Sequence, residues 1–346
     1  MANLKKQVVA AKSAERSRDR SSLLKVSSLQ IVESATETPR RCIRSTGILV
    51  ALILIVVLGT GCSLKRIAVN SVGDLLAAGD SVYERDDDLI LVGAALPFSL
   101  KLVESMLSES PNHRGLLITA SRGYVLYAYA YVHFEADRTA VEDLDRALVH
   151  RQRARRLYLR AHDFAVRALE VAYPGFATRL GEDPERAVSS VLREDAQEAV
   201  PPLYWAAAAL GLAISVSQNN AALLARLPEV EAMLDRALAL DEAWNAGTLH
   251  EFQVTWAAAR RGYPNEEKIQ RHYQRALELS RGSRASLYLA YAEAVSIPKQ
   301  DKAEFQELLD KTLAIDIDAH PNYRLLNVLA QRRAMWLKSR TLELFF

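Results

Sequence analysis

A seven-residue helix ending recurs along the second half of the chain, and it limits the possible folds more than any other feature. The segments Asp235–Asp241, Gln274–Ser280 and Asp310–Asp316 each place Ala or Thr before a leucine, with Leu or Ile two residues later. The shared leucine returns after 39 and then after 36 residues. Weaker copies lie at Val166–Val171 and Ser105–Pro111. Self-similarity at this spacing is typical of stacked helical hairpins, none of which can bury its apolar face alone.

We expect each copy to end the second helix of a hairpin, as in a degenerate tetratricopeptide repeat. The small residue lets the neighbouring helix come close, and the leucine fills the space between hairpins. Ala-Leu-x-Leu also occurs in ordinary amphipathic helices, but the repeated register favours a repeat. With only 14 Gly and 11 Pro in 346 residues, long stretches lack helix breakers. The sequence therefore predicts an all-α fold, a right-handed solenoid of stacked helical hairpins with cryptic repeats.

Three segments are predicted along the chain. Residues 1–39 are polar and rich in Ser, Lys and Arg, which indicates a disordered basic extension or a mis-assigned start. Residues 40–62 combine three arginines, an apolar run at 48–58 and small residues before Cys62. This run is shorter than the roughly 20 residues of a membrane-spanning helix, and the pattern resembles a bacterial lipoprotein signal peptide with Cys62 lipidated. Residues 63–346 are expected to form a single helical domain.

The alternative for the leader is an uncleaved anchor in which Cys62 is an ordinary residue. In both cases the helical domain is tethered to a membrane on its non-cytoplasmic side. Gly59 stands where the usual lipobox has leucine, and Leu58 lies one position further from the cysteine. The exact form of the anchor therefore stays open.

Charge and residue usage argue against several classes of protein. Residues 1–61 hold 10 of the 44 Lys and Arg residues but 4 of the 42 Asp and Glu residues, so the remainder is slightly acidic and no nucleic-acid partner is predicted. Both cysteines, Cys42 and Cys62, precede the domain, which therefore has no thiolate site. The sequence around His250 is not the His-Glu-x-x-His zinc pattern. No phosphate-binding loop or nucleophile elbow is present, and we predict no enzyme activity, metal or cofactor.

Proline positions suggest where helices break. We expect Pro97 to break or kink the helix that follows Asp86-Asp87-Asp88, with Phe98–Leu107 forming the second arm of a hairpin. Pro201-Pro202 is expected to open the helix Leu203–Ser215.

Aromatic and polar residues in apolar helices are the candidates for a ligand cleft, because the concave face of a solenoid collects such residues. Tyr124, Tyr127 and Tyr131 share one helix face, while Tyr129 lies off it. The alternative for each candidate is that it packs in the core or satisfies a buried group or charge. The full set is Tyr124, Tyr127, Tyr131, Arg160, Tyr204, Trp205, Asn219, His250, Tyr291 and Glu293.

Four segments in this order resemble one family. They are Ala154–Leu169, Leu203–Ser215, Ala290–Asp301 and Arg333–Lys338. Together they resemble the T-component (TatT) lipoproteins of tripartite ATP-independent periplasmic (TRAP) transporters, over about residues 63–346. The resemblance implies a periplasmic, lipid-anchored solenoid of tetratricopeptide-like hairpins, a homotrimer and a periplasmic solute-binding protein as partner. It also implies hydrophobic or organic-acid-like ligands and no catalytic residues.

The expected function is therefore that of a non-enzymatic, lipid-anchored accessory subunit of a TRAP-type transporter. It would bind a small organic or hydrophobic ligand and dock a solute-binding protein, on the periplasmic side of either the inner or the outer membrane. The alternative is a scaffold lipoprotein that assembles envelope proteins and has no small-molecule site.

Overall fold

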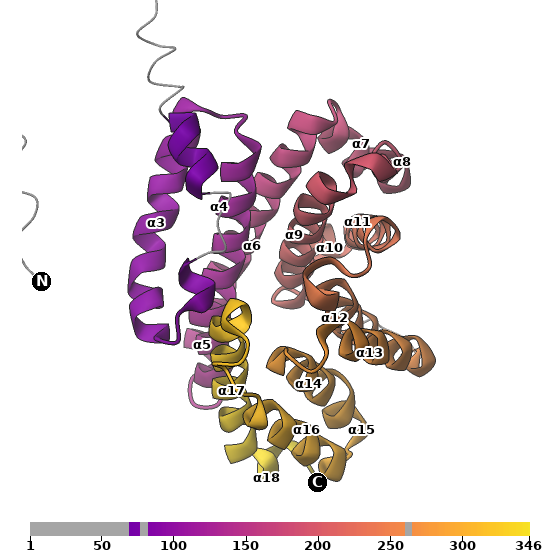
Figure 1. The fold of residues 1–346 in the computed structure, drawn as a ribbon. Coiled ribbons are helices and arrows are strands. Elements are labelled where there is room, and N and C mark those ends of the chain that lie inside the picture. The colour runs from indigo at the N-terminus through magenta and orange to yellow at the C-terminus, as the bar shows by residue number, and fades with distance from the viewer. Residues whose placement is uncertain (1–68, 77–81, 260–264) are drawn as a thin grey trace, which may run out of the picture. The chain divides into compact units, whose positions relative to one another are not determined.

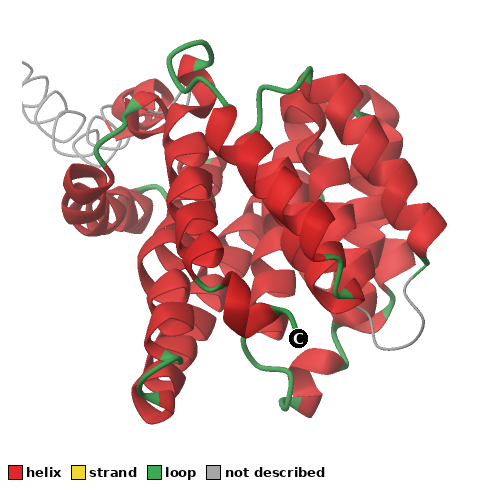
Figure 2. Ribbon diagram, turned by 90° about the horizontal axis from the view of Figure 1, so that it is seen from below, coloured by secondary structure: helices red, strands yellow, loops and turns green. Residues whose placement is uncertain are grey.

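The computed structural model describes residues 69–76, 82–259 and 265–346, all within one compact unit, Thr60–Phe346. Every regular element among these described residues is helical, so the all-α prediction is confirmed (Figure 2). The predicted basic extension, the signal peptide and Cys62 lie outside the described residues.

The longer helices follow one another along the chain and are separated by turns or by shorter helices (Figure 1). They are α3 (Leu89–Glu109), α4 (Arg114–Tyr127), α6 (Leu144–Ala172), α9 (Ala196–Ser215), α11 (Leu227–Leu240), α12 (Trp244–Ala259), α13 (Glu266–Ser280), α16 (Lys302–Ala314) and α17 (Arg324–Ser339). Shorter elements are η1 (Val82–Arg85), η2 (Ala128–His133), α5 (Phe134–Thr139), α7 (Phe176–Glu182), α8 (Pro184–Ser189), η3 (Arg193–Asp195), α10 (Ala221–Leu224), α14 (Ala285–Tyr291), η4 (Ala292–Ser296), α15 (Ile297–Lys299), η5 (Pro321–Tyr323) and α18 (Thr341–Leu344).

The recurring sequence segments lie at helix ends. The three strong copies coincide with the C-terminal parts of α11, α13 and α16, and the two weaker copies with those of α6 and α3. The small residue of each strong copy is buried, namely Ala237, Ala276 and Thr312. A Cβ added at Gly247 would lie 3.3 Å from the Cα of Ala276, so the backbone of α12 comes close to α13 at this small residue. Tetratricopeptide-like hairpins remain a prediction.

Neighbouring helices are packed through alanine-rich faces. Ala161 and Ala165 of α6 and Ala206 and Ala209 of α9 have no exposed surface, and α6 packs extensively against α9. Side chains without a long stem let two helix axes approach closely, which brings more of the flanking Leu and Phe residues into contact.

The last of the longer helices returns to the N-terminal elements. In Figure 1, α17 (yellow) lies beside the indigo and purple elements, and it contacts η1 and α3. Leu325 and Leu329 of α17 share a buried cluster with Leu89, Val92 and Leu96 of α3. The successive helices therefore end against the elements with which the described domain begins.

The predicted helix break at Pro97 and the predicted helix start after Pro201-Pro202 were wrong. α3 continues through Pro97 without a break, because Val92, Leu96 and Leu100 on both sides of it bury one continuous face. Burial of these side chains outweighs the ~3 kcal/mol that an interior proline costs. α9 begins at Ala196, and Pro201-Pro202 lie inside it.

A side chain compensates for one of the hydrogen bonds lost in α9. Pro202 cannot donate to the carbonyl of Glu198 four residues earlier. Instead, Arg114 Nη2 of α4 donates to that carbonyl at 3.4 Å, and its Nη1 pairs with the Glu198 carboxylate at 2.5 Å. The prolines are therefore accommodated by a contact between helices, which the local sequence does not reveal.

α3 has apolar side chains on its exposed side as well as on its buried side. One side is buried, while Ile90, Leu91, Phe98 and Leu102 on the other side are exposed. Among the described helices, α3 is long and apolar enough to cross a membrane, by length and composition alone. Exposed apolar faces of this kind commonly mark interaction surfaces.

Replacing the small residue of a repeat copy should destabilise the protein. Ala237→Leu adds bulk at a fully buried position, and we expect the free energy of unfolding to fall by about 1–3 kcal/mol. Ala239→Leu, two residues later on the exposed side of α11, is the control and should change it by less than about 0.5 kcal/mol. Urea titration followed by circular dichroism measures both. Equal effects would show that the small residue has no special packing role.

Candidate functional site

A cavity of about 730 Å³ lies between the N-terminal, central and C-terminal helices. Its walls come from α4, η2, α9, α12, α14, η4 and α17. Most of the lining is aliphatic or aromatic, including Val125, Leu126, Leu212, Ile214, Phe252, Trp256, Leu289 and Leu329. The charged side chains in the lining are Glu251, Arg284, Glu293 and Arg333. An apolar cavity with a few polar groups is typical of a site for a small organic ligand.

Two π-helical turns border this cavity. η2 carries Tyr129 and η4 carries Glu293, and both side chains line the cavity. A π-turn inserts one extra residue into a helix and rotates the side chains that follow, and such turns occur frequently at functional sites. Here they direct one aromatic and one charged side chain inward from helices that otherwise pack in the core.

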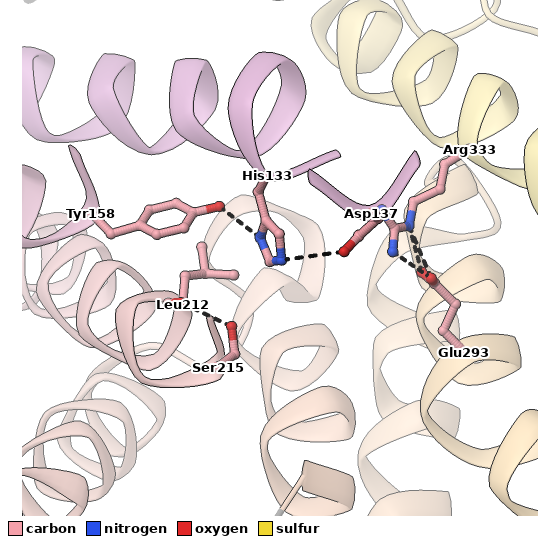
Figure 3. Close-up of polar contacts among 7 residues, drawn as sticks. All are labelled: His133, Asp137, Tyr158, Leu212, Ser215, Glu293 and Arg333. Carbon is pink, nitrogen blue, oxygen red and sulfur yellow. Dashed lines mark hydrogen bonds and ion pairs between the residues drawn. The ribbon is translucent and has the colours of Figure 1, made fainter. Parts of the chain in front are cut away.

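Arg333 joins three parts of the chain at the wall (Figure 3). Its Nε and Nη2 donate to the Glu293 carboxylate at 2.7–3.0 Å, and its Nη1 donates to Asp137 Oδ2 at 2.9 Å. The Arg333 side chain is 15% exposed, so these bonds are largely shielded from solvent. The two carboxylates raise the pKa of Arg333 against the effect of burial. α17, η4 and α5 are thereby tied together.

His133 lies next to this ion-pair network. Its Nδ1 is 3.1 Å from the Tyr158 hydroxyl, and its Nε2 is 3.9 Å from Asp137 (Figure 3). Burial and the charge on Arg333 lower the pKa of His133 to about 4, although Asp137 opposes the shift. The imidazole is therefore neutral at neutral pH.

A second arginine, Arg284, faces the cavity from the start of α14. Its Nε donates to Glu251 Oε2 of α12 at 2.8 Å, and its guanidinium carbon lies 5.3 Å from the centre of the Tyr323 ring. Only 5% of the Arg284 side chain is exposed. Its Nη1 is buried and has no hydrogen-bond acceptor among the described residues.

Aromatic rings cover the wall between α9 and α12. Tyr204 contacts Trp205, Trp244 and Phe252, with ring centroids 4.9, 5.0 and 6.3 Å away. Burial, together with the charge on Glu251, raises the pKa of Tyr204, so its hydroxyl stays protonated. The indole Nε1 of Trp256 is also buried and lacks an acceptor among the described residues. This wall of the cavity therefore has several hydrogen-bond donors and few free hydrogen-bond acceptors.

The backbone has an unusual conformation where α11 joins α12. Asn245, Ala246 and Gly247 all have left-handed φ angles of 47°, 52° and 82°. Thr248 Oγ1 donates to the Asn245 carbonyl at 2.8 Å, and both Asn245 and Thr248 line the cavity. Left-handed angles are costly for a residue such as alanine, and they concentrate at functional sites.

Three of the residues predicted for a ligand cleft line this cavity: Tyr204, Trp205 and Glu293. The others lie elsewhere, mostly with partners of their own. Tyr124 donates a hydrogen bond to Glu104, which also pairs with Arg160, and Tyr127 accepts one from Arg153. Tyr131 donates to the Leu89 carbonyl, and Tyr291 donates to Gln270. His250 contacts His272 and Glu242, and Asn219 is exposed in a turn. A role in ligand binding remains a prediction for all ten.

The sequence reasoning missed the other polar and aromatic residues of the lining, among them Tyr129, Glu251, Trp256, Arg284 and Arg333. Tyr129 was set aside because it lies off the tyrosine stripe, yet that stripe faces the core, and the π-turn directs Tyr129 into the cavity. The sequence signal that could have identified Tyr129 as a cavity residue was its position away from the face that the other tyrosines of its helix share.

The arrangement suits binding better than catalysis. The two carboxylates in the lining, Glu251 and Glu293, are both bonded to arginines. Within residues 69–76, 82–259 and 265–346, no group of three or more His, Cys, Asp or Glu residues could hold a metal ion. The cavity can bury an apolar molecule and orient it through a few hydrogen bonds.

Comparison with known proteins finds one family model and one relative that are similar to this chain over most of its length. The family model described as "TRAP transporter T-component" matches residues 85–345. A protein of Treponema pallidum (strain Nichols), named only "Uncharacterized protein", is 32% identical over 301 residues, which is 82% of this chain and 93% of the relative.

Removing the Arg333 charge should destabilise the domain. Arg333→Met leaves the partly buried Asp137 and Glu293 carboxylates without their cation, and we expect a loss of about 1–3 kcal/mol in the free energy of unfolding. Adding Asp137→Asn and Glu293→Gln should restore most of it. Lys299→Met, which breaks an exposed pair with Glu266, is the control and should cost less than about 1 kcal/mol. Failure of the neutral triple variant to recover stability would contradict this account.

The neutral state of His133 should make stability depend on pH. Its pKa is about 4 in the folded protein and near 6.5 when unfolded, so the unfolded chain binds more protons between these values. Stability is fully present above about pH 6.5 and is lost as the pH falls toward 4, by up to about 3 kcal/mol. Thermal melts of His133→Gln should show a smaller loss across this window. An unchanged pH profile would contradict the prediction.

Proposed function

We propose that this chain, which belongs to the TRAP transporter T-component family, binds a small organic or hydrophobic ligand in the cavity and docks a periplasmic solute-binding protein. Family membership makes it an accessory component of a TRAP transporter, at a membrane of the cell envelope, in a family of transport proteins rather than enzymes. The observation that carries the ligand-binding role is the cavity of about 730 Å³ with apolar walls.

The affinity would come from apolar surface. Burying an alkyl or aromatic group against Leu212, Phe252 and Trp256 removes that group from water, at roughly 25 cal/mol per Å². The bound pairs Arg284–Glu251 and Arg333–Glu293 would orient the polar part of the ligand.

We further propose that Cys62 carries the lipid anchor, that the hairpins form a tetratricopeptide-like right-handed solenoid, and that the chain forms a homotrimer on the periplasmic side of the membrane. The leader sequence and the recurring helix endings support the first two proposals. The homotrimer follows from the family resemblance alone.

The second candidate function is a scaffold for envelope proteins without a small-molecule site. The exposed apolar face of α3, with Ile90, Leu91, Phe98 and Leu102, favours a role in protein contacts. The two functions differ in whether the cavity binds a small molecule.

Filling the cavity should separate these two functions. In Ala290→Trp, an indole replaces a methyl group in the lining and should displace a ligand without breaking an ion pair. Native mass spectrometry of the Thr60–Phe346 unit should show a small adduct on the wild type and at least tenfold less on the variant. Cross-linking in intact cells should capture a solute-binding protein with both chains. A wild type that never carries an adduct, while cross-linking captures other envelope proteins, would favour the scaffold.

A further inference from the structure

We propose that the first turns of α6 form the surface to which the solute-binding protein docks, and that this surface recognises an acidic patch with an apolar centre on that partner. This inference rests on the proposed docking function and names the part of the chain that performs it. We call this part, where α5 turns into α6, the tip surface. It consists of Val141, Leu144, Leu148, Val149, Arg151, Arg155 and Arg156.

Exposed aliphatic side chains form the centre of the tip surface. All four of them are 45–64% exposed, and they belong to none of the hydrophobic clusters of the described domain. They lie within nine residues of the chain, and Leu144 and Leu148 share one face of α6. Single exposed apolar residues are ordinary, whereas a group of them commonly marks a contact surface.

A cluster of arginines follows directly along α6. Residues 146–156 hold five arginines and no Asp or Glu, although the chain beyond residue 61 is slightly acidic as a whole. Arg155 lies seven residues after Leu148 and therefore on the same helix face. Arg156 has the same relation to Val149. Positive charge is thereby placed next to the apolar centre.

The arginines further along α6 have partners within the fold, and those of the tip surface do not. Arg160 pairs with Glu104 at 2.7 Å, and Arg167 donates to the Pro111 carbonyl at 3.0 Å. No side-chain ion pair or hydrogen bond joins the three arginines of the tip surface to another described residue. Their charges therefore do not hold the domain together and are available to a partner.

The tip surface lies far from the point where the described domain begins. The Nε2 atom of His113 is 3.2 Å from the Asn70 carbonyl oxygen, so helix 69–76 packs beside the start of α4. From there α4, η2 and α5 follow one another without interruption and span about 40 Å at 1.5 Å per residue (Figure 1). With an anchor at Cys62, close to helix 69–76 in the chain, the tip surface faces away from the membrane. This position favours a protein partner over a lipid surface.

The charge pattern also favours a protein over a uniformly anionic surface. Glu142 and Asp145 are exposed beside the apolar residues. An anionic membrane or a nucleic acid would bring negative charge against these carboxylates, which is unfavourable. A protein can place its own carboxylates opposite Arg155 and Arg156, apolar groups opposite Leu148, and leave the acidic end of the surface to solvent. Such a patch is what we expect on the solute-binding protein.

Site-specific photo-cross-linking in intact cells tests the proposal with the full chain. p-Benzoylphenylalanine replaces Leu148 in the tip surface or, as a control, Phe98 on the exposed face of α3. We expect the solute-binding protein, identified by mass spectrometry, in at least fivefold higher yield at position 148 than at position 98. Capture at position 98 alone would leave the docking function standing and overturn the tip surface. Capture at neither position would overturn both.

Charge reversal tests whether the arginines provide the recognition. Arg155→Glu combined with Arg156→Glu should lower the yield at position 148 at least fivefold, because like charges would then face each other across the interface. Arg186→Glu combined with Arg193→Glu makes the same change in net charge at exposed arginines of α8 and η3, and should leave the yield within twofold of the parent chain. Equal yields in the two double variants would overturn the proposal.

The identity of the cross-linked product excludes other occupants. A lipid adduct at position 148, or a cross-linked dimer of this chain, would show that a membrane or a second copy covers the tip surface, and would overturn the proposal. Salt provides an independent readout with the purified full chain and the solute-binding protein. Raising NaCl from about 50 to about 300 mM should weaken their binding at least tenfold, because exposed charges are screened. An affinity that does not change with salt would contradict recognition by the arginines.

Discussion

The partly buried contact of Arg333 with Asp137 and Glu293 is the interaction on which the arrangement of the cavity depends. One guanidinium satisfies carboxylates from two other segments, and its own burial would be unfavourable without them. Because an ion pair of this kind is directional, it also fixes how α17, η4 and α5 are oriented. The hydrophobic cluster around Leu325 and Leu329 holds α17 against α3, but apolar contacts are not directional and do little to set the orientation of the helices. Polar groups therefore give the cavity wall its geometry, and apolar groups give it most of its surface.

The periodic features of the fold could be predicted from the sequence, and its irregular features could not. The repeat endings and the scarcity of Gly and Pro were sufficient for an all-α fold and for the ends of α11, α13 and α16. Pro97 and Pro201-Pro202 misled the prediction because tertiary contacts, such as Arg114 with Glu198, compensate for local defects. Helix propensity depends on the local sequence, whereas this compensation comes from Arg114, which lies 84 positions from Glu198.

The cavity was predictable only where a polar or aromatic side chain stood out within an apolar helix, as with Tyr204, Trp205 and Glu293. Arg284 and Arg333 looked like ordinary surface arginines in the sequence, since neither their burial nor their partners follow from periodicity. The partner of Arg333 on α5 is 196 residues away in the chain. The π-turns of η2 and η4 shift the helical register within a few residues, which no averaged 3.6-residue period can reveal.

The return of α17 to the N-terminal helices has a consequence for how the protein is made. Most helix contacts join neighbours in the chain and can form as synthesis proceeds, since local contacts close quickly. The contact between Arg333 and Asp137 joins residues 196 positions apart, so it cannot form until α17 has been synthesised. Until then the apolar lining is an open surface, available to chaperones or to other nascent chains. The cavity is thus completed only when α17 has been made, and a chain that ends before α17 would be largely helical without this wall of the cavity.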